Sequence, residues 1–293
     1  MHGSMLLRLR AQPMLRRTAG EEANTPHFSF GNKVGFMSDQ GTPAGDVEGK
    51  RFLYDAPELL TVEAHGALGL SPIEAPYAFA AKAQAVPIAM SEFRSVQRHY
   101  PIIFAGNELP SPLAVLGTDG ENYFVDAAGQ WEPGVYIPAY LRIYPLALAN
   151  TGDDRFAVVI DRASKVVQES PEIPFFENGE LSEAMKPRLD FVQAFDAEIT
   201  RTKQFCERLK ALDLVASQQV AWNQNENSED IARYGAVNPE KLSALSGEDF
   251  TSLRNDGSLA GIFAHVFSLD LWNDIMRRRE ARRQASTQES KDA

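Results

Sequence analysis

The chain has 293 residues, of which 44% are apolar and 24% are charged, and its net charge at pH 7 is -11. This length allows a large core in one domain or two. The acidic balance argues against a general affinity for nucleic acid or for anionic membranes, because both need clustered positive charge. Cys206 is the only cysteine, which excludes an intrachain disulfide and a thiolate zinc cluster.

Residues 1–50 show no sustained hydrophobic periodicity, so we predict a disordered or poorly ordered N-terminal extension. Arginines interrupt every apolar run of the first twenty residues, and we recognise no cleavable secretory signal there. No stretch approaches the ~18 consecutive apolar residues of a membrane-spanning helix. We therefore expect a cytoplasmic protein without membrane insertion.

Residues 51–170 are predicted to form a β-rich α+β core in which one short pattern occurs twice. A helix-like run in SEFRSVQRHYPIIFAG stops at Tyr100-Pro101, because proline biases the preceding residue away from the α region, and an apolar strand follows. The segment IPAYLRIYPLALAN repeats this order around Tyr144-Pro145. A second apolar run follows each pair, first PLAVLG and later RFAVVID.

We interpret this pattern as an internal duplication of one helix–strand–strand unit. Two such units predict an α+β fold with a mixed or antiparallel sheet. The Asp-Gly pair in TDGE supplies a tight turn between PLAVLG and ENYFVDAAGQW, which read as two strands of a hairpin. The alternative is that a helix ending in Tyr-Pro is a common stop signal that occurs twice by chance.

Residues 171–186 are polar and interrupted by proline and glycine, which is typical of a surface connection. Residues 187–280 are predicted to form a helical C-terminal region packed on the core. Its first long helix has an apolar stripe at spacings of three and four that contains Cys206, so we expect an inert, packed thiol. Between this helix and the last two, the polar segment from Val215 to Gly235 predicts a loop or short hairpin. Residues 281–293 are expected to be a disordered tail.

The last helix, around AHVFSLDLW, is apolar on more than one side, which indicates that it is buried or meets a partner. His265 lies among these apolar residues. It could act as a general base if a carboxylate such as Asp270 oriented it, but a core histidine with satisfied hydrogen bonds fits equally well. Glu121, Asp126 and Asp161 could converge as paired carboxylates, although acids at turns and strand ends are usually only solvated.

No local metal site, dinucleotide or triphosphate loop, or nucleophile elbow is present in the sequence. We accordingly expect no cofactor and no metal. A polar–aromatic set on loops beside the sheet is the best candidate for binding a peptide, sugar or other small ligand. Alternatively, its aromatic members cover the open face of the sheet. The set consists of Asn107, Asn122, Asp126, Trp131, Tyr136 and Tyr140.

The ordered segments VPIAMSEFRSVQRHYPIIFAG, LAVLGTDGENYFVDAAGQW, YIPAYLRIYPLALA and FDAEITRTKQFCERLKALDLV resemble the SapC family of bacterial proteins. The resemblance runs from about Phe52 to Glu280, and residues 1–50 fall outside it. It concerns the proteins associated by name with surface-layer loci, and not the peptide-uptake permease subunit that shares the name. The resemblance implies an accessory of surface-layer or outer-surface systems and carries over no catalytic residues.

Three hypotheses about function follow. The leading one is a non-enzymatic binding or accessory protein whose C-terminal helices dock a protein partner or a second copy. The competing one is an enzyme, or enzyme partner, that acts on a small molecule or peptide with carboxylates and His265. The third is a structural subunit of a surface lattice, which would require export.

Overall fold

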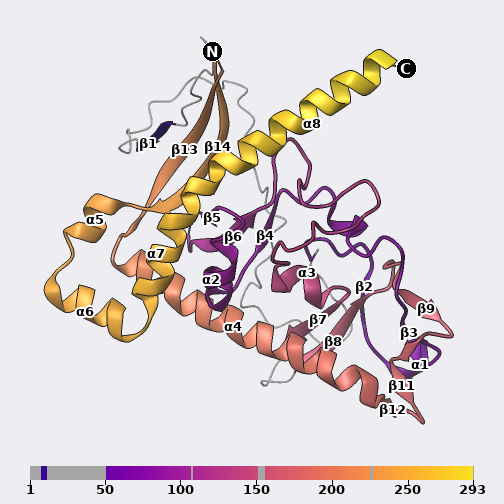
Figure 1. Cartoon of the computed structure of the whole chain (residues 1–293). Helices are drawn as coiled ribbons and strands as arrows, with labels where there is room; N and C mark the ends of the chain where they lie inside the picture. Colours follow the sequence, from indigo (N-terminus) through magenta and orange to yellow (C-terminus); the bar gives the residue numbers. More distant parts are fainter. Residues whose placement is uncertain (1–7, 12–50, 107, 151–155, 225–226, 293) are drawn as a thin grey trace, which may run out of the picture. The chain divides into compact units, whose positions relative to one another are not determined.

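The structure is a computed structural model that describes residues 8–11, 51–106, 108–150, 156–224 and 227–292 (Figure 1). Its sheets are antiparallel throughout the described residues, and its C-terminal region is mainly helical, so the predicted α+β class is confirmed. The chain divides into two compact units. Of the described residues, unit 1 contains 8–11, 84–106, 108–123, 201–224 and 227–292, and unit 2 contains 51–83, 124–150 and 156–200.

Unit 1 is built on a six-stranded sheet of order β1-β13-β14-β5-β6-β4. Its buried strands are rich in branched and aromatic residues, which suit a pleated surface covered by side chains. In that order, the strands are Arg8–Ala11, Val215–Gln224, Asn227–Val237, Ile102–Ala105, Ser111–Val115 and Ala85–Pro87.

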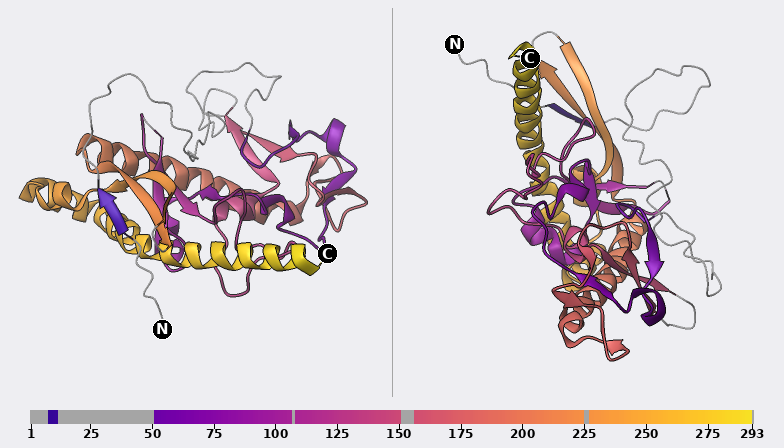
Figure 2. Two further views of the ribbon diagram at one scale, coloured as in Figure 1. Left: turned by 90° about the horizontal axis from the view of Figure 1, so that it is seen from above. Right: turned by 90° about the vertical axis from the view of Figure 1, so that its right-hand side faces the viewer.

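The hairpin of β13 and β14 is much longer than the loop or short hairpin expected for this segment (Figures 1 and 2). Its pairing runs from Val215↔Val237 to Gln224↔Asn227, with a register shift between Val220 and Ala221. That shift breaks the alternation of apolar and polar residues on which a sequence-based strand prediction depends. Because of its polar composition, this segment was predicted to be a loop or short hairpin, whereas it forms two long strands.

Strand β5 meets β14 at a single pair of residues, Gly235 and Phe104. A Cβ atom on Gly235 would lie 2.9 Å from the Val215 side chain and 3.1 Å from the Phe104 carbonyl oxygen. Only glycine therefore allows β5 to come this close to the hairpin. The two halves of the sheet are joined at this point.

Helices surround this sheet in unit 1. The first is short, and the later ones form the C-terminal region (Figure 1). Helix α7 packs against α2, β5, β14 and α6. The helices are α2 (Phe93–Val96), α5 (Pro239–Ser243), α6 (Gly247–Asn255), α7 (Ser258–Ser268) and α8 (Trp272–Asp292), with the 3-10 turns η2 (Met90–Glu92) and η4 (Leu269–Leu271).

Helix α8 continues to Asp292, whereas residues 281–293 were expected to be disordered. Arg279, which is 4% exposed, donates hydrogen bonds to Asp119 and to Glu229 of β14. Arg283, one turn later, forms ion pairs with the same two carboxylates. The network holds α8 against the hairpin and so supports a helix whose residues 281–288 are all exposed.

Unit 2 contains smaller sheets and short helices. Tyr54, Ala147 and Val159 form one of its buried clusters. Its strand sets have the orders β2-β8-β7, β10-β3-β9 and β11-β12. The strands are β2 (Pro57–Leu59), β3 (Leu68–Leu70), β7 (Leu146–Asn150), β8 (Phe156–Asp161), β9 (Val167–Glu169), β10 (Ile173–Pro174), β11 (Phe176–Glu177) and β12 (Glu180–Leu181). The helical turns are α1 (Val62–His65), η1 (Ala78–Ala80), α3 (Ala139–Ile143) and η3 (Glu183–Met185).

The segment 171–186, expected to be a plain connection, thus carries three short strands and the turn that leads into α4 (Lys186–Ala211). Helix α4 contributes to both units, because the boundary falls between Thr200 and Arg201. The predicted apolar stripe of α4 is buried at Leu189, Val192, Phe195, Thr202, Cys206 and Leu209. Pro187 lies in its first turn, where the missing N–H costs no helical hydrogen bond.

The two Tyr-Pro segments each show the predicted order of a helix followed by two antiparallel strands, α2-β5-β6 and α3-β7-β8. Their surroundings differ. Tyr100 is fully buried, and β5 and β6 belong to the six-stranded sheet of unit 1. The half-buried Tyr144 donates a hydrogen bond to Asp161, precedes a cis proline, and leads into a separate sheet of unit 2. Internal duplication remains a prediction. The two segments were expected to share one sheet, but they belong to two different sheets.

Candidate binding surface

The six residues predicted to bind a ligand do not form one cluster. Asn107 lies outside the described residues, and Asn122 belongs to unit 1. The other four, Asp126, Trp131, Tyr136 and Tyr140, belong to unit 2. Their ligand-binding role remains a prediction, and the contacts of Asp126, Trp131, Tyr136 and Tyr140 within unit 2 are described below.

Asp126 and Trp131 belong to one tight turn, closed by the bridge between Val125 and Trp131. The Asp126 carboxylate accepts the backbone N–H of Gln130, which orders the turn. Trp131 is 7% exposed and lies edge-on to Tyr77 and stacked on Phe124. The indole therefore packs against the rings of Tyr77 and Phe124 within unit 2. This packing agrees with the alternative interpretation, in which the aromatic residues have a structural role.

Tyr136 precedes α3, and Tyr140 and Arg142 lie on this helix. The Arg142 guanidinium lies over the rings of Tyr136 and Phe191, and it donates a hydrogen bond to the Tyr136 hydroxyl. Tyr140 lies edge-on to Phe195 and donates to the carbonyl of Phe52. Since Phe191 and Phe195 belong to α4, these aromatic contacts fasten α3 to that helix.

Asn122 is 2% exposed and follows the turn at Asp119 and Gly120, both of which have the positive φ angles expected of the Asp-Gly pair. The backbone N–H of Tyr123 donates to the Leu116 carbonyl, which closes the turn. Beyond it, residues 122–131 form turns and one bridge, not the second strand that was predicted. Asn122 is thus an interior residue of the turn.

Asp161 has no exposed surface, and its carboxylate has four hydrogen-bond donors. It accepts the backbone N–H groups of Asp55, Ala56 and Ala163 and the hydroxyl of Tyr144. A carboxylate so completely bonded fixes the chain and has no lone pair directed at a substrate. Asp126, in contrast, is exposed, and its carboxylate accepts the backbone N–H of Gln130.

His265 is fully buried in α7, and both of its ring nitrogens bond to backbone. Nδ1 donates to the Ile102 carbonyl at 2.8 Å, and Nε2 accepts the Val237 N–H at 3.1 Å. Burial lowers the pKa of His265 to about 4, against a smaller opposing contribution from the Ile102 carbonyl. The imidazole is therefore neutral, with its only lone pair occupied, and its proposed role as a general base is wrong.

The imidazole instead completes the sheet. Gly235 pairs with Phe104 in the antiparallel register. Val237, two residues later in β14, therefore lies opposite Ile102, two residues earlier in β5. At that position the ring takes the place of a direct N–H to carbonyl bond, because it accepts from one strand and donates to the other. Ser268, one turn later on α7, accepts the Ile102 N–H. Both backbone groups of Ile102 are thus satisfied by α7.

The opposite face of α7 is solvent-exposed and apolar. Phe263 is 40% exposed and Phe267 is 64% exposed, and their rings stack with centroids 5.9 Å apart. Ala260 is also exposed, and Leu259 and Val266 are half-buried. We call this face, defined by Leu259, Ala260, Phe263, Val266 and Phe267, the outer face of α7.

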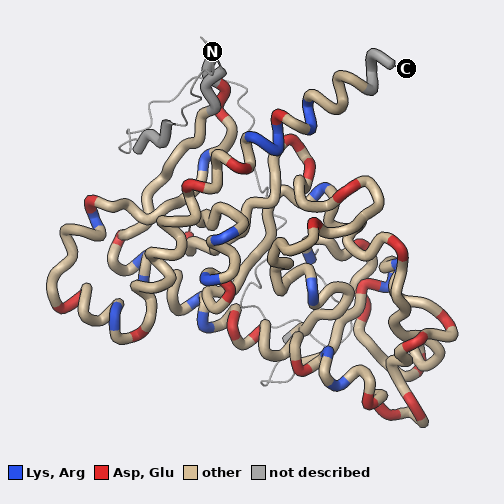
Figure 3. The backbone as a smooth tube through the Cα atoms, viewed as in Figure 1, with Lys and Arg blue, Asp and Glu red and all other residues tan. Residues whose placement is uncertain are grey.

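The whole of α7 contains no Asp, Glu, Lys or Arg, whereas charged residues are spread over much of the rest of the described chain (Figure 3). Among the described residues, three of the five large hydrophobic side chains that are exposed lie on α6 and α7. An exposed apolar face without charge is typical of a contact surface. The sequence indicated it as a helix apolar on more than one side, but nothing in one sequence distinguished the inner face from the outer.

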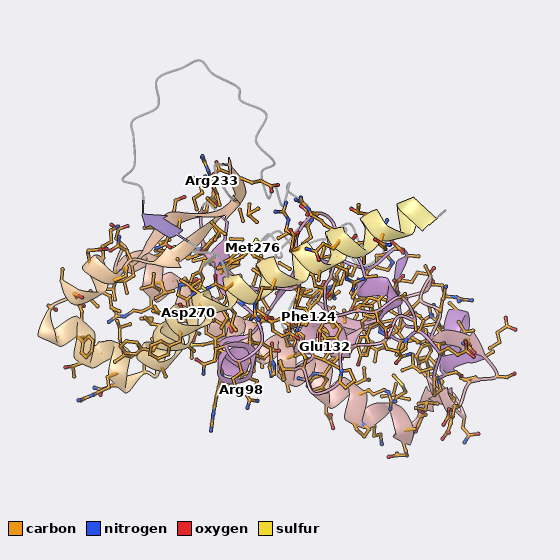
Figure 4. The ribbon with its side chains drawn as sticks, turned by 45° about the horizontal axis from the view of Figure 1, so that its top comes forward. Arg98, Phe124, Glu132, Arg233, Asp270 and Met276 are labelled. Carbon is orange, nitrogen blue, oxygen red and sulfur yellow. The ribbon has the colours of Figure 1, made fainter. Side chains whose placement is uncertain are left out.

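Exposed charged residues lie just beyond both ends of α7, Arg254 and Asp256 before it and Asp270 after it. Arg254, at the end of α6 beside the start of α7, is exposed and bonds only to the Asn255 side chain among the described residues. Asp270, in η4 just past the end of α7, is exposed, and its carboxylate has no partner among those residues (Figure 4). A basic and an acidic group are therefore available at opposite ends of one apolar helix.

Cys206 is 1% exposed, and burial, with the nearby Glu207 charge, raises the pKa of its thiol to about 12. The prediction of a packed, inert thiol is confirmed. Within the part of the chain that the structure describes, no three metal-ligating side chains gather into a possible metal site. In the same part, no helix combines the length and the apolar character needed to cross a membrane.

The chain belongs to the SapC family, whose model matches residues 60–275. The match covers most of the chain and includes both Tyr-Pro segments, α4 and the outer face of α7. Comparisons with curated proteins and with solved structures gave no match.

Proposed function

We propose that this SapC-family protein is a non-enzymatic accessory or binding protein that docks a protein through the outer face of α7. The exposed, stacked pair of Phe263 and Phe267 on a helix without charged residues is the observation that carries the proposal. Aromatic side chains at the centre of a contact surface contribute most of the binding energy at protein interfaces.

The rigid attachment of α7 supports this proposal. His265 and Ser268 bond the inner face of the helix to two strands, so the outer face is held in place before any partner arrives. A surface fixed in advance loses little conformational entropy on binding. The resemblance to proteins associated with surface-layer loci leads us to place the docking step in a bacterial surface-layer or outer-surface system. A cytoplasmic location suits a step that precedes export.

Site-specific photo-crosslinking in the native host tests this function. A photoreactive phenylalanine analogue replaces Phe267 in one variant and Phe156 in another, because Phe156 is similarly exposed at 55% but belongs to unit 2. We expect a discrete adduct of defined mass from position 267 and none from position 156. The absence of an adduct from position 267, or the same adducts from both positions, would contradict the proposal.

A further inference from the structure

The outer face of α7 has features that are complementary to the same face of a second copy of the chain. An inference about this second copy rests on the proposed docking function and makes it more specific. A twofold-symmetric contact brings the same patch from both copies together, so the patch must be complementary to itself. Stacked phenylalanines satisfy this condition, since aromatic rings pack against one another in offset or edge-on arrangements. The first requirement is thus met by Phe263 and Phe267.

The charges at the ends of the face satisfy the second requirement. Helix α7 has 11 residues, and at about 1.5 Å per residue it is roughly 16 Å long. When two such helices pack antiparallel, the start of one lies beside the end of the other. Arg254 of each copy then faces Asp270 of the other, and two ion pairs form from groups that have no charged partner among the described residues.

An anionic membrane is a poor occupant of this face, because a chain of net charge -11 repels it. The same net charge opposes the approach of two copies, and the uncharged helix α7 is a place where this repulsion is small. We propose that a second copy of this chain occupies the outer face of α7, in an antiparallel, twofold-symmetric dimer centred on Phe263 and Phe267. The patch is small beside a standard interface, so we expect a dissociation constant of about micromolar or weaker.

Sedimentation equilibrium of the purified full chain tests the dimer over a dilution series. We expect the average mass to rise from one chain towards two with concentration. Phe267→Ser should weaken association by ~10-fold or more, as loss of a central aromatic side chain does. Phe156→Ser is the matched control and should leave the dissociation constant unchanged. A wild-type chain that stays monomeric up to about millimolar concentration, or a dimer unaffected by Phe267→Ser, overturns the inference.

A charge exchange tests the antiparallel arrangement. Arg254→Asp or Asp270→Arg alone places like charges opposite each other and should weaken association several-fold, about 3-fold to 10-fold. The double variant restores opposite charges and should recover most of the wild-type affinity. Both sites are exposed, and an unchanged melting temperature for each variant confirms that folding is intact. A double variant as weak as the two single ones overturns the arrangement.

The two experiments separate this inference from the function on which it rests. If the purified chain is monomeric while position 267 crosslinks in the host to a different protein, the second copy is wrong and the docking function stands. If neither association nor an adduct is found, both are wrong. An adduct of two copies of the chain, with rescue by the charge exchange, supports both.

Discussion

The two faces of α7 differ in how their side chains are used. On the inner face, His265 and Ser268 bond to the backbone of Ile102 and Val237, and no polar atom of the imidazole remains unpaired. On the outer face, Phe263 and Phe267 have exposed rings that contact each other. Apolar residues are usually buried and polar ones exposed, so this helix reverses the common arrangement at its most distinctive positions.

The two faces of α7 therefore differ in role: the inner face stabilises the fold, and we propose that the outer face binds a partner. The buried histidine is a component of the sheet, because it connects two strands whose direct pairing is limited to Gly235 and Phe104. The rings of Phe263 and Phe267 are partly exposed and remain available for a partner. Substitutions on the inner face should therefore affect unfolding, and substitutions on the outer face should affect association.

The largest effect is expected from His265→Ala. The change leaves the Val237 N–H and the Ile102 carbonyl buried without partners and opens a cavity, so it should lower the free energy of unfolding by about 4 kcal/mol. Urea denaturation followed by circular dichroism measures this loss. Phe263→Ala, on the opposite face of the same helix, is the control. A loss below about 1 kcal/mol for His265→Ala would contradict the role of the ring in the sheet.

The next effect concerns pH. Because the pKa of His265 is about 4 in the folded chain and near 6.5 when unfolded, the unfolded state binds the proton first. The stability is therefore fully present above about pH 6.5 and falls as the pH drops towards 4, by on the order of 3 kcal/mol. Denaturation at several pH values checks this. The decline in this window should be absent from a folded His265→Gln variant and retained in Phe267→Ser.

Below that window the carboxylates of the Arg279 network take over. Hydrogen bonds from Arg279 lower the pKa of Glu229, and for Asp119 the bonds and charges of Arg279 and Arg283 outweigh burial and also lower the pKa. Their contribution to stability is present above the ordinary carboxylate range and is lost as the pH falls through the lowered values. Arg279→Met should remove this part of the acid sensitivity, measured by the same denaturation series, while the decline between pH 6.5 and 4 remains.

A smaller effect is expected from Ser268→Ala, which leaves the Ile102 N–H without its acceptor. The loss should be about 2 kcal/mol by urea denaturation. Because Ser268 and His265 both bond to Ile102, and the Ser268 hydroxyl also donates to the His265 carbonyl, the two substitutions should not be additive. Strict additivity in the double variant would show that the two side chains act independently.

The smallest effect on stability is expected from Phe267→Ser, within about 0.5 kcal/mol of the wild type, since its ring is mostly exposed. The same variant should show the greatest loss of association. A large loss of stability would show instead that the ring is needed for the fold, and the contrast between the two faces would disappear.

The sequence predicted the features that depend on local chemistry. The stop of α3 at Tyr144-Pro145, the Asp-Gly turn and the apolar stripe of α4 are each set by residues within a few positions of one another, and all occur in the structure. Helix α2 differs, because it ends at Val96, before Tyr100 is reached. The placement of strands was not predictable in this way. Strand β5 pairs with β14, more than 120 residues later, and the two Tyr-Pro hairpins join different sheets.

The candidate site shows the same limit. Of the aromatic residues chosen from the sequence, Trp131 is buried against Tyr77 and Phe124, and Tyr136 and Tyr140 are half-buried. The role of His265 depends on Ile102, which lies 163 residues away in the chain, so no local pattern could reveal it. The apolar character of α7 was visible, but its direction was not, because only the packed structure decides which face meets the sheet.

Hydroxyl-radical footprinting of the purified chain at increasing concentration tests the central claim directly, because it reports the exposure of individual phenylalanine rings. We predict that oxidation of Phe263 and Phe267 falls as the protein becomes concentrated, while oxidation of Phe156 stays constant. Equal oxidation of Phe263 and Phe267 at every concentration would contradict the assignment of the outer face of α7 as the contact between copies.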